Sequence, residues 1–352
     1  MLQALAEFIT EIQPPDKAAM AAARRHLDQL TKPPGSLGKL EDIACQLAAI
    51  TGETMPDLGK KAIVVMAGDH GVCEEGVSAY PAEVTPQMVL NFLHGGAAVN
   101  VLAGQAGADV ICVDIGVNAD LEHPRLYARK VRKGTRNMMR EAAMTKQEAV
   151  DAIVTGIQLV EELTMQGYRL FATGDMGIGN TTASSAVLAV LTGADLAGTV
   201  GRGTGICGEL LLHKRSVIER AIALNKPNAN DPLDVLAKVG GLEIAGLTGV
   251  ILGAARHRCP VVIDGFISSA AALVASRMAE LSTAYMLASH LSQEPGHAFI
   301  LQALELAPML HMDMRLGEGT GAALALPLID ASGRIMKEMA TFAEAGISQS
   351  DK

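Results

Sequence analysis

A glycine-rich segment, Gly174-Asp175-Met176-Gly177-Ile178-Gly179-Asn180-Thr181-Thr182, is the part of the chain best suited to ligand chemistry. It lies between an apolar run over 168–173, which predicts a strand, and a stretch over 183–191, which predicts a helix. Glycines let backbone N–H groups turn toward an anion, and a helix N-terminus adds partial positive charge. The segment matches neither the Walker A loop nor the dinucleotide fingerprint. We therefore predict a small phosphate monoester as ligand; a plain turn capped by Asn180 or Thr181 is the alternative.

A carboxylate, Glu318, lies between two glycines in Arg315-Leu316-Gly317-Glu318-Gly319-Thr320-Gly321. An apolar helix is predicted directly after it, over 322–329, and the dipole of that helix favours an ionised carboxylate at this position. A charged, accessible carboxylate can accept a proton. Glu318 is therefore a candidate general base, with a purely structural acid at the helix start as the alternative.

A lysine, Lys214, lies on the apolar face of a helix predicted over 206–224, where Cys207, Leu211, Ile218 and Ile222 share its side at helical spacing. Such a side chain either reaches a buried anion or extends past the apolar face to solvent. The preceding Gly201-Arg202-Gly203-Thr204-Gly205 would add backbone donors at the same anion. We favour the anion, because a phosphate loop is already indicated.

A long loop is predicted after the first strand, and it carries polar side chains that could surround a flat ligand. Ser78 and Tyr80 lie in it, and Gln87 follows in the first turn of a helix predicted to begin at Thr85-Pro86, with Thr85 as N-cap. Ordinary surface residues are the alternative. His70 and His290 have no second ligand at suitable spacing, so we predict structural histidines and no metal site.

The elements around these residues alternate between strands and helices. Strands are predicted over 62–67, 110–113, 168–173 and 260–263, and the acids Asp69, Asp114, Asp175 and Asp264 lie at or near their ends. Fully apolar strands separated by helices predict a parallel sheet covered on both faces, with ligands at the carboxyl ends of the strands. The four acids are thus site candidates or caps of the following turns. Helices are expected on both sides of Pro14-Pro15, and 125–140 is expected to be an exposed basic excursion.

Composition limits the class of partner. The chain has 352 residues, a net charge of −9, no Trp and five scattered cysteines. Few aromatics and negative charge disfavour nucleic-acid binding, and the cysteines predict reduced thiols in a cytoplasmic protein. The start of the chain lacks the basic region of a signal peptide, and the longest apolar stretches are too short to span a bilayer. Small-molecule partners are therefore expected.

Several motifs in order carry a resemblance to a known family. They are Pro33-Pro34-Gly35-Ser36-Leu37-Gly38, Ala67-Gly68-Asp69-His70-Gly71-Val72, Gly76-Val77-Ser78-Ala79-Tyr80-Pro81, the glycine-rich segment, Asp264-Gly265-Phe266, Ser289-His290 and Leu316-Gly317-Glu318-Gly319-Thr320-Gly321. The chain resembles the nicotinate-nucleotide–dimethylbenzimidazole phosphoribosyltransferases of cobalamin biosynthesis from about Pro33 to Asp330.

The resemblance implies transfer of a phosphoribosyl group from nicotinate mononucleotide to 5,6-dimethylbenzimidazole, giving α-ribazole 5′-phosphate and nicotinate. It implies a homodimer without a cofactor, whose subunit has a Rossmann-like large domain, over about 31–294, and a small helical domain from both chain ends, 1–30 and 295–352. It implies Glu318 as catalytic base. Asp175 stands where the family has Glu, and we predict it as a second catalytic carboxylate, near the ribose, where positive charge develops as nicotinate leaves. The implied binding residues are Gly177, Ile178, Gly179, Asn180, Thr181, Gly203 and Lys214 for phosphate and ribose, and Ser78, Tyr80, Gln87, Met176 and Leu316 for the aromatic base.

The chemistry of such a transfer needs only one carboxylate. The leaving pyridinium departs neutral at its ring nitrogen, and the attacking azole loses a proton, so one base suffices where glycoside hydrolysis usually needs two acids. Inversion at the anomeric carbon is expected. A nucleotide-sensing protein without catalysis and a dinucleotide-dependent oxidoreductase are alternatives, and the acceptor could be a benzimidazole, adenine or a phenol.

Overall fold

The computed structural model describes residues 2–348 as a parallel sheet with helices on both faces. The strands stand in the order β3-β2-β1-β4-β5-β6, and every pairing is parallel. Their bounds are β1 (Lys60–Gly68), β2 (Asp109–Gly116), β3 (Tyr127–Ala128), β4 (Tyr168–Met176), β5 (Val261–Ile263) and β6 (Met286–Ala288). The predicted parallel sheet is confirmed. The order reverses between β1 and β4, which is where sheets of this kind form a ligand crevice at the carboxyl ends of the strands.

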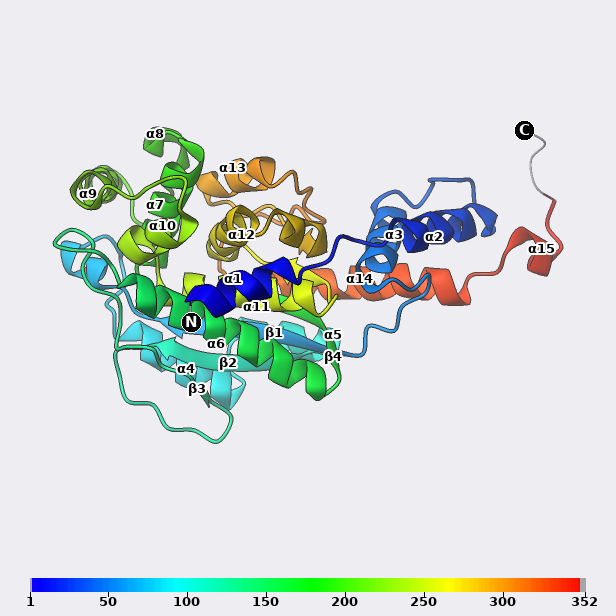
Figure 1. The fold of residues 1–352 in the computed structure, drawn as a ribbon, viewed down its shortest axis with the longest axis horizontal. Helices are drawn as coiled ribbons and strands as arrows, with labels where there is room; N and C mark the ends of the chain where they lie inside the picture. Colours follow the sequence, from blue (N-terminus) through cyan, green and yellow to red (C-terminus); the bar gives the residue numbers. More distant parts are fainter. Residues whose placement is uncertain (1, 349–352) are drawn as a thin grey trace.

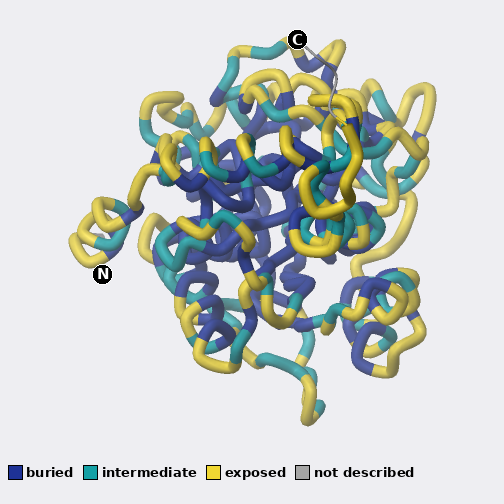
Figure 2. Tube along the Cα trace, turned by 90° about the vertical axis from the view of Figure 1, so that its right-hand side faces the viewer, coloured by how far each residue is buried: buried dark blue, intermediate teal, exposed yellow. Residues whose placement is uncertain are grey.

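Both faces of the sheet are buried, because alternate side chains of each strand enter different cores. In β1, Val64 and Met66 belong to one apolar core, whereas Ile63 and Val65 belong to the other. Figure 2 shows the buried trace concentrated at the centre of the molecule. Strands that are apolar on both faces have no polar alternation, as expected for a doubly covered parallel sheet.

The first core is covered by helices from most of the chain. They are α1 (Leu2–Thr10), α6 (Lys146–Met165), α7 (Asn180–Thr192), α8 (Leu196–Thr199), α9 (Glu209–Asn225), α10 (Pro232–Val239), α11 (Leu242–Arg256), α12 (Phe266–Met278) and α13 (Pro295–Ala303), with the short 3₁₀ helix η2 (Glu280–Tyr285). Helices α6 and α11 pack so closely that a Cβ on Gly249 would lie 1.9 Å from the carbonyl oxygen of Ile153.

The second core is covered by α3 (Lys39–Thr51), α4 (Val84–His94), α5 (Ala98–Ala106) and α14 (Thr320–Glu338). A third, smaller core joins α2 (Lys17–Gln29) and α3 to the far end of α14, through residues such as Leu27, Ala48 and Met336. In Figure 1 these helices and α15 (Phe342–Ala345) extend to one side of the sheet, whereas α1 lies over α11. The domain boundaries at 31 and 294 stay a prediction.

Several local expectations need correction. The segment 125–140 is only partly an exposed excursion: it contains the edge strand β3, and Thr135, Asn137 and Met138 are buried. Strands β3 and β6 escaped prediction because two- and three-residue strands show no periodicity. Within residues 2–348, no helix combines the length and apolar character that crossing a membrane requires.

Candidate active site

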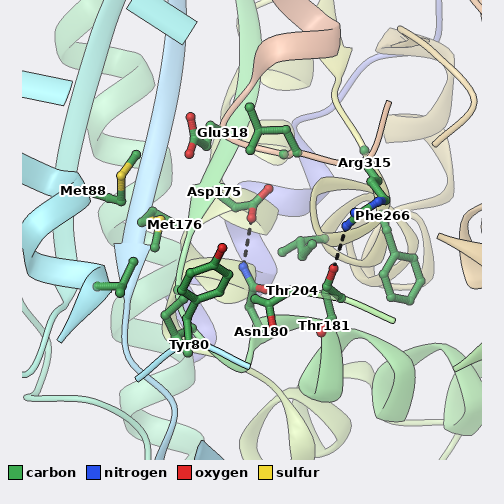
Figure 3. Close-up of a pocket in the computed structure, with 18 of the residues that line it drawn as sticks. Tyr80, Met88, Asp175, Met176, Asn180, Thr181, Thr204, Phe266, Arg315 and Glu318 are labelled. Atoms are coloured by element: carbon green, nitrogen blue, oxygen red, sulfur yellow. Dashed lines mark hydrogen bonds between the residues drawn. The ribbon is translucent and has the colours of Figure 1, made fainter. Parts of the chain in front are cut away.

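A cavity of about 610 Å³ opens at the carboxyl ends of β4 and β5, beside the point where the strand order reverses. Its walls come from the loop at Tyr80, helix α4 and the turn after it, the glycine-rich segment, the 203–204 turn, the segments after β5 and β6, and the turn before α14. Figure 3 shows Asp175 and Glu318 together on one side of this cavity, and Asn180 and Thr181 on another. Two carboxyl groups and a potential anion site therefore lie in one cavity.

The glycine-rich segment is more compact than expected, because β4 continues through Met176. A Cβ on Gly177 would lie 2.2 Å from the carbonyl oxygen of Gly68, so the close approach of this turn to β1 requires glycine. Helix α7 begins at Asn180, and its N-cap is Gly179 at φ 92°, without a side-chain cap. The predicted capping by Asn180 or Thr181 is wrong, and both side chains face other groups.

Thr85 also has a different role from the one predicted. Helix α4 begins at Val84 with Glu83 as N-cap, so Thr85 and Pro86 lie inside its first turn. The buried Oγ1 of Thr85 instead accepts a hydrogen bond from the backbone N–H of Ile178, with 3.1 Å between N and Oγ1. This contact fixes the glycine-rich segment against α4.

Lys214 reaches the same segment from α9, where it is buried with 1% of its surface exposed. Its Nζ donates to Thr181 Oγ1 at 2.7 Å and to the carbonyl oxygen of Gly201 at 3.3 Å. Extension of the side chain to solvent is therefore wrong. Helix α9 begins at Glu209, later than predicted, which leaves Cys207 exposed ahead of it. Burial lowers the pKa of Lys214 to about 8, against an opposing effect of Glu294.

Glu318 lies in a turn that only a constrained backbone adopts. Its φ is 64°, between Gly317 at 83° and Gly319 at 89°, so three successive residues are left-handed. The residue is 7% exposed and lines the cavity. Burial, with a further contribution from the negative charge of Asp264, raises the pKa of Glu318 to about 7. A carboxyl group with this pKa exchanges protons readily near neutral pH.

Asp175 lies directly beneath this turn, since a Cβ on Gly317 would be 3.4 Å from both carboxyl oxygens of Asp175. Asp175 Oδ2 accepts a hydrogen bond from Asn180 Nδ2 at 2.9 Å. Burial and the charges of Asp264, Glu243 and Glu318 raise the pKa of Asp175 well above its ordinary value, although the Asn180 contact opposes them. These surroundings favour the neutral form of Asp175, which leaves Glu318 as the easier acid to ionise.

The other three acids at the strand ends accept hydrogen bonds from backbone N–H groups and do not line the cavity. Asp69 accepts from the N–H of Asn118 at 2.7 Å, and Asp114 accepts from that of Val117 at 2.9 Å. Asp264 accepts from the N–H groups of Gly319 and Ala322. Of the four acids, Asp175 alone is part of the cavity wall in the described structure.

The residues predicted for a flat ligand are only partly brought together. Tyr80, Met176 and Leu316 line the cavity, and Tyr80 and Leu316 are 57% and 56% exposed at its mouth. Ser78 instead bonds to Thr204, with 3.1 Å between the two hydroxyl oxygens. Gln87 is exposed to solvent.

Several cavity residues escaped the sequence argument, among them Met88, Phe266, Ser292, Glu294 and Arg315. Glu294 is buried, and its Oε1 accepts from the N–H of Gly203 at 2.9 Å. The only sequence signal at Glu294 is its place before Pro295, the first residue of α13, which indicates a helix start and no chemistry. Nothing in the sequence indicates that Glu294 lies close to Gly203.

The two histidines considered as metal ligands have other partners. His70 Nε2 and Glu243 Oε1 are 2.7 Å apart and fully buried. His290 Nδ1 lies 2.9 Å from Ser289 Oγ. Both rings are thus held by neighbouring side chains behind the cavity wall.

Comparison with known proteins shows that the chain is similar to phosphoribosyltransferases. A family model described as phosphoribosyltransferase matches residues 12–347. The nicotinate-nucleotide–dimethylbenzimidazole phosphoribosyltransferase of Chloroflexus aggregans is 58% identical over 346 residues, 98% of each chain. The enzyme of the same name from Desulforamulus reducens is 56% identical over 347 residues, covering 98% of this chain and 99% of its own.

A solved structure with a similar fold bears the name of the same family. The crystal structure of CobT from Thermus thermophilus superimposes with a TM-score of 0.91 and 49% sequence identity. The match covers 95% of this chain and 100% of that one.

Proposed function

This chain belongs to the nicotinate-nucleotide–dimethylbenzimidazole phosphoribosyltransferase family, and we propose that it transfers the phosphoribosyl group of nicotinate mononucleotide to 5,6-dimethylbenzimidazole. The products are α-ribazole 5′-phosphate, used for the lower ligand of cobalamin, and nicotinate. The observation that carries the proposal is that Glu318, whose pKa burial raises to about 7, lines one cavity together with the glycine-rich turn, Tyr80 and Leu316.

In the proposed step, a ring nitrogen of the benzimidazole attacks the anomeric carbon while the bond to the nicotinate nitrogen breaks. The electron pair of that bond returns to the pyridine ring, so nicotinate leaves without needing a proton. The attacking azole becomes cationic and loses its other N–H proton to Glu318. Attack from the face opposite nicotinate converts the β-linkage into an α-linkage.

The phosphate is assigned to the end of the cavity formed by Gly177, Ile178, Gly179, Asn180 and Thr181. The support is the N-terminus of α7 together with the Lys214 ammonium, which bonds to Thr181 Oγ1. Gly203 lies beside both groups, because a Cβ on it would be 3.2 Å from Lys214 Nζ. The cation and the helix N-terminus would hold the phosphate near Thr181 and so orient the nucleotide, beside a buried carboxyl group, Glu294, whose Oε1 accepts from the N–H of Gly203.

Asp175 is assigned to the ribose. Its protein surroundings favour the neutral form, but the pyridinium of nicotinate mononucleotide would lower its pKa by placing a positive charge nearby. The ionised carboxylate would then stabilise charge that develops on the ribose as nicotinate leaves. The contact with Asn180 Nδ2 holds the Asp175 carboxyl group in its place.

Tyr80, Met176 and Leu316 are assigned to the aromatic base, and Ser78 and Gln87 would join them only if their side chains turn toward the cavity. The high exposure of Tyr80 and Leu316 supports a base that enters from this side. The homodimer, the cytoplasmic location and the absence of a cofactor remain part of the proposal, as does the small helical domain.

The test is incubation of the purified protein with nicotinate mononucleotide and dimethylbenzimidazole, with adenine and a phenol as competing acceptors. We expect a single α-linked product, identified by NMR at the anomeric proton, and unchanged activity after treatment with a chelator. A β-linked product would contradict the inversion, and tight nucleotide binding without any product would favour the sensing protein.

A further inference from the structure

We infer that Asp264 is a positioning residue of the active site, which holds the strained turn around Glu318 and places a second acidic group next to it. The inference rests on the proposed function, in which Glu318 accepts the proton. It concerns a residue that does not reach the cavity and acts through another side chain.

The first ground is how the turn is held. Both oxygens of Asp264 are used: Oδ2 accepts from the N–H of Gly319 at 3.1 Å and Oδ1 from that of Ala322 at 2.9 Å. Helix α14 has no side-chain cap of its own, because its N-cap is Gly319. Asp264, which follows β5, therefore caps a helix that begins 56 residues later in the chain.

The second ground is strain. Glu318 is a non-glycine residue with φ 64°, a backbone conformation that persists only where the surroundings impose it. The N–H of Gly319, which donates to Asp264, belongs to the peptide group that directly follows Glu318. The hydrogen bond therefore constrains the backbone next to the strained residue, Glu318. The opposite side is closed by β4, because a Cβ on Gly174 would lie 2.7 Å from the carbonyl oxygen of Glu318. The direction of the Glu318 side chain thus follows from Asp264 and Gly174.

The third ground is charge. The groups that face this turn are Asp175 after β4, Asp264 after β5, His290 after β6 and Arg315 in the same loop, with Glu243 of α11 behind Asp175. Asp264 is the one acid of this set that adds to the effect of burial on Glu318, and the pKa of Glu318 rises to about 7. Burial raises the pKa of Asp264 above its ordinary value, although His290 and the helix N–H groups that Asp264 accepts from oppose this rise.

The experiment compares Asp264→Asn with Asp114→Asn in the whole enzyme. Asp114 is a matched control, since it is buried, follows the same strand-end pattern and accepts from a backbone N–H, but that N–H belongs to Val117 and not to the turn around Glu318. An Asn side chain has one acceptor oxygen, so at position 264 it cannot serve both N–H groups. We expect turnover to fall about 10²-fold for Asp264→Asn, as for a catalytic group displaced by about 1 Å, and little for Asp114→Asn.

Two readouts separate positioning from a general loss of structure. The acidic limb of the pH–rate profile moves to lower pH in Asp264→Asn, because a like charge near Glu318 is gone, whereas Asp264→Glu keeps that limb in place even if its rate is low. In the second readout, Asp264→Asn costs little when Glu318 is already Gln, because both changes then act on one proton transfer. Melting temperatures show which variants fold. The position of the acidic limb is compared only among the variants that fold.

An unmoved acidic limb together with additive losses in the double variant would overturn the inference, and so would equal losses for Asp264→Asn and Asp114→Asn. A wild-type enzyme that forms no α-ribazole phosphate would overturn the proposed function instead, and with it the base on which this inference rests.

Discussion

Glu318 in the cavity wall and Lys214, which bonds to the cavity residue Thr181, predict a narrow, bell-shaped dependence of kcat/KM on pH. Glu318 accepts a proton only when it is ionised, so activity is lost as the pH falls below its pKa of about 7. Lys214 attracts phosphate only when it is protonated, so activity is lost as the pH rises above its pKa of about 8. The optimum therefore lies between these two values.

The magnitude follows from the two pKa values. At about pH 7.5, about 60% of the free enzyme holds ionised Glu318 and protonated Lys214 together. At about pH 6 or about pH 9 this fraction is about one tenth, so kcat/KM falls about sixfold on either side. At about pH 5 the fall reaches about 60-fold, because each further unit on a limb costs about a factor of ten.

Initial rates of α-ribazole phosphate formation, measured by chromatography at low nucleotide concentration across this range, give the profile. The substrates titrate as well, the phosphate with a pKa of about 6, but they do so equally with every variant. Comparison with Glu318→Gln and Lys214→Met therefore assigns the limbs: the first should lose the acidic limb and the second the alkaline limb. An acidic limb that survives in Glu318→Gln would show that another group takes the proton.

Four substitutions extend these expectations. Glu318→Gln should lower turnover about 10²–10⁴-fold, the usual range for loss of an acid–base group, with nucleotide binding kept in a calorimetric titration. Asp175→Asn should reduce the single-turnover rate by less than Glu318→Gln, and the reverse order would exchange their assigned roles. Lys214→Met should weaken nucleotide binding by about 1.5–3 kcal/mol, the range for a hydrogen bond to a charged group, without affecting acceptor binding; unchanged nucleotide affinity would remove Lys214 from the phosphate site. Gly249→Ala should lower the melting temperature, because its Cβ would lie 1.9 Å from a backbone oxygen of α6. Gly104→Ala on α5, where the Cβ would enter open space, should leave the melting temperature unchanged. Equal effects of the two substitutions would contradict the close packing of α6 on α11.

Local sequence determined the elements that carry the site. The apolar runs of β1, β2 and β4 are long enough to show that both faces are buried, and in a parallel sheet their carboxyl ends meet at one edge. The glycine-rich segment after β4 and the Gly317-Glu318-Gly319 turn were likewise identifiable, since glycine spacing is a local property of the chain. These patterns were sufficient to predict that the glycine-rich segment and Glu318 lie at this edge, and both line the cavity.

Only the tertiary structure decided which groups act on one another. Lys214 meets Thr181, Thr85 meets Ile178, and Asp264 meets Gly319 across long stretches of chain. In the sequence Asp264 and Asp175 look alike, as acids near the end of an apolar strand, and yet one holds a helix terminus while the other lines the cavity. The difference arises because burial, hydrogen-bond partners and neighbouring charges depend on distances in space, and the order of residues along a strand does not specify them.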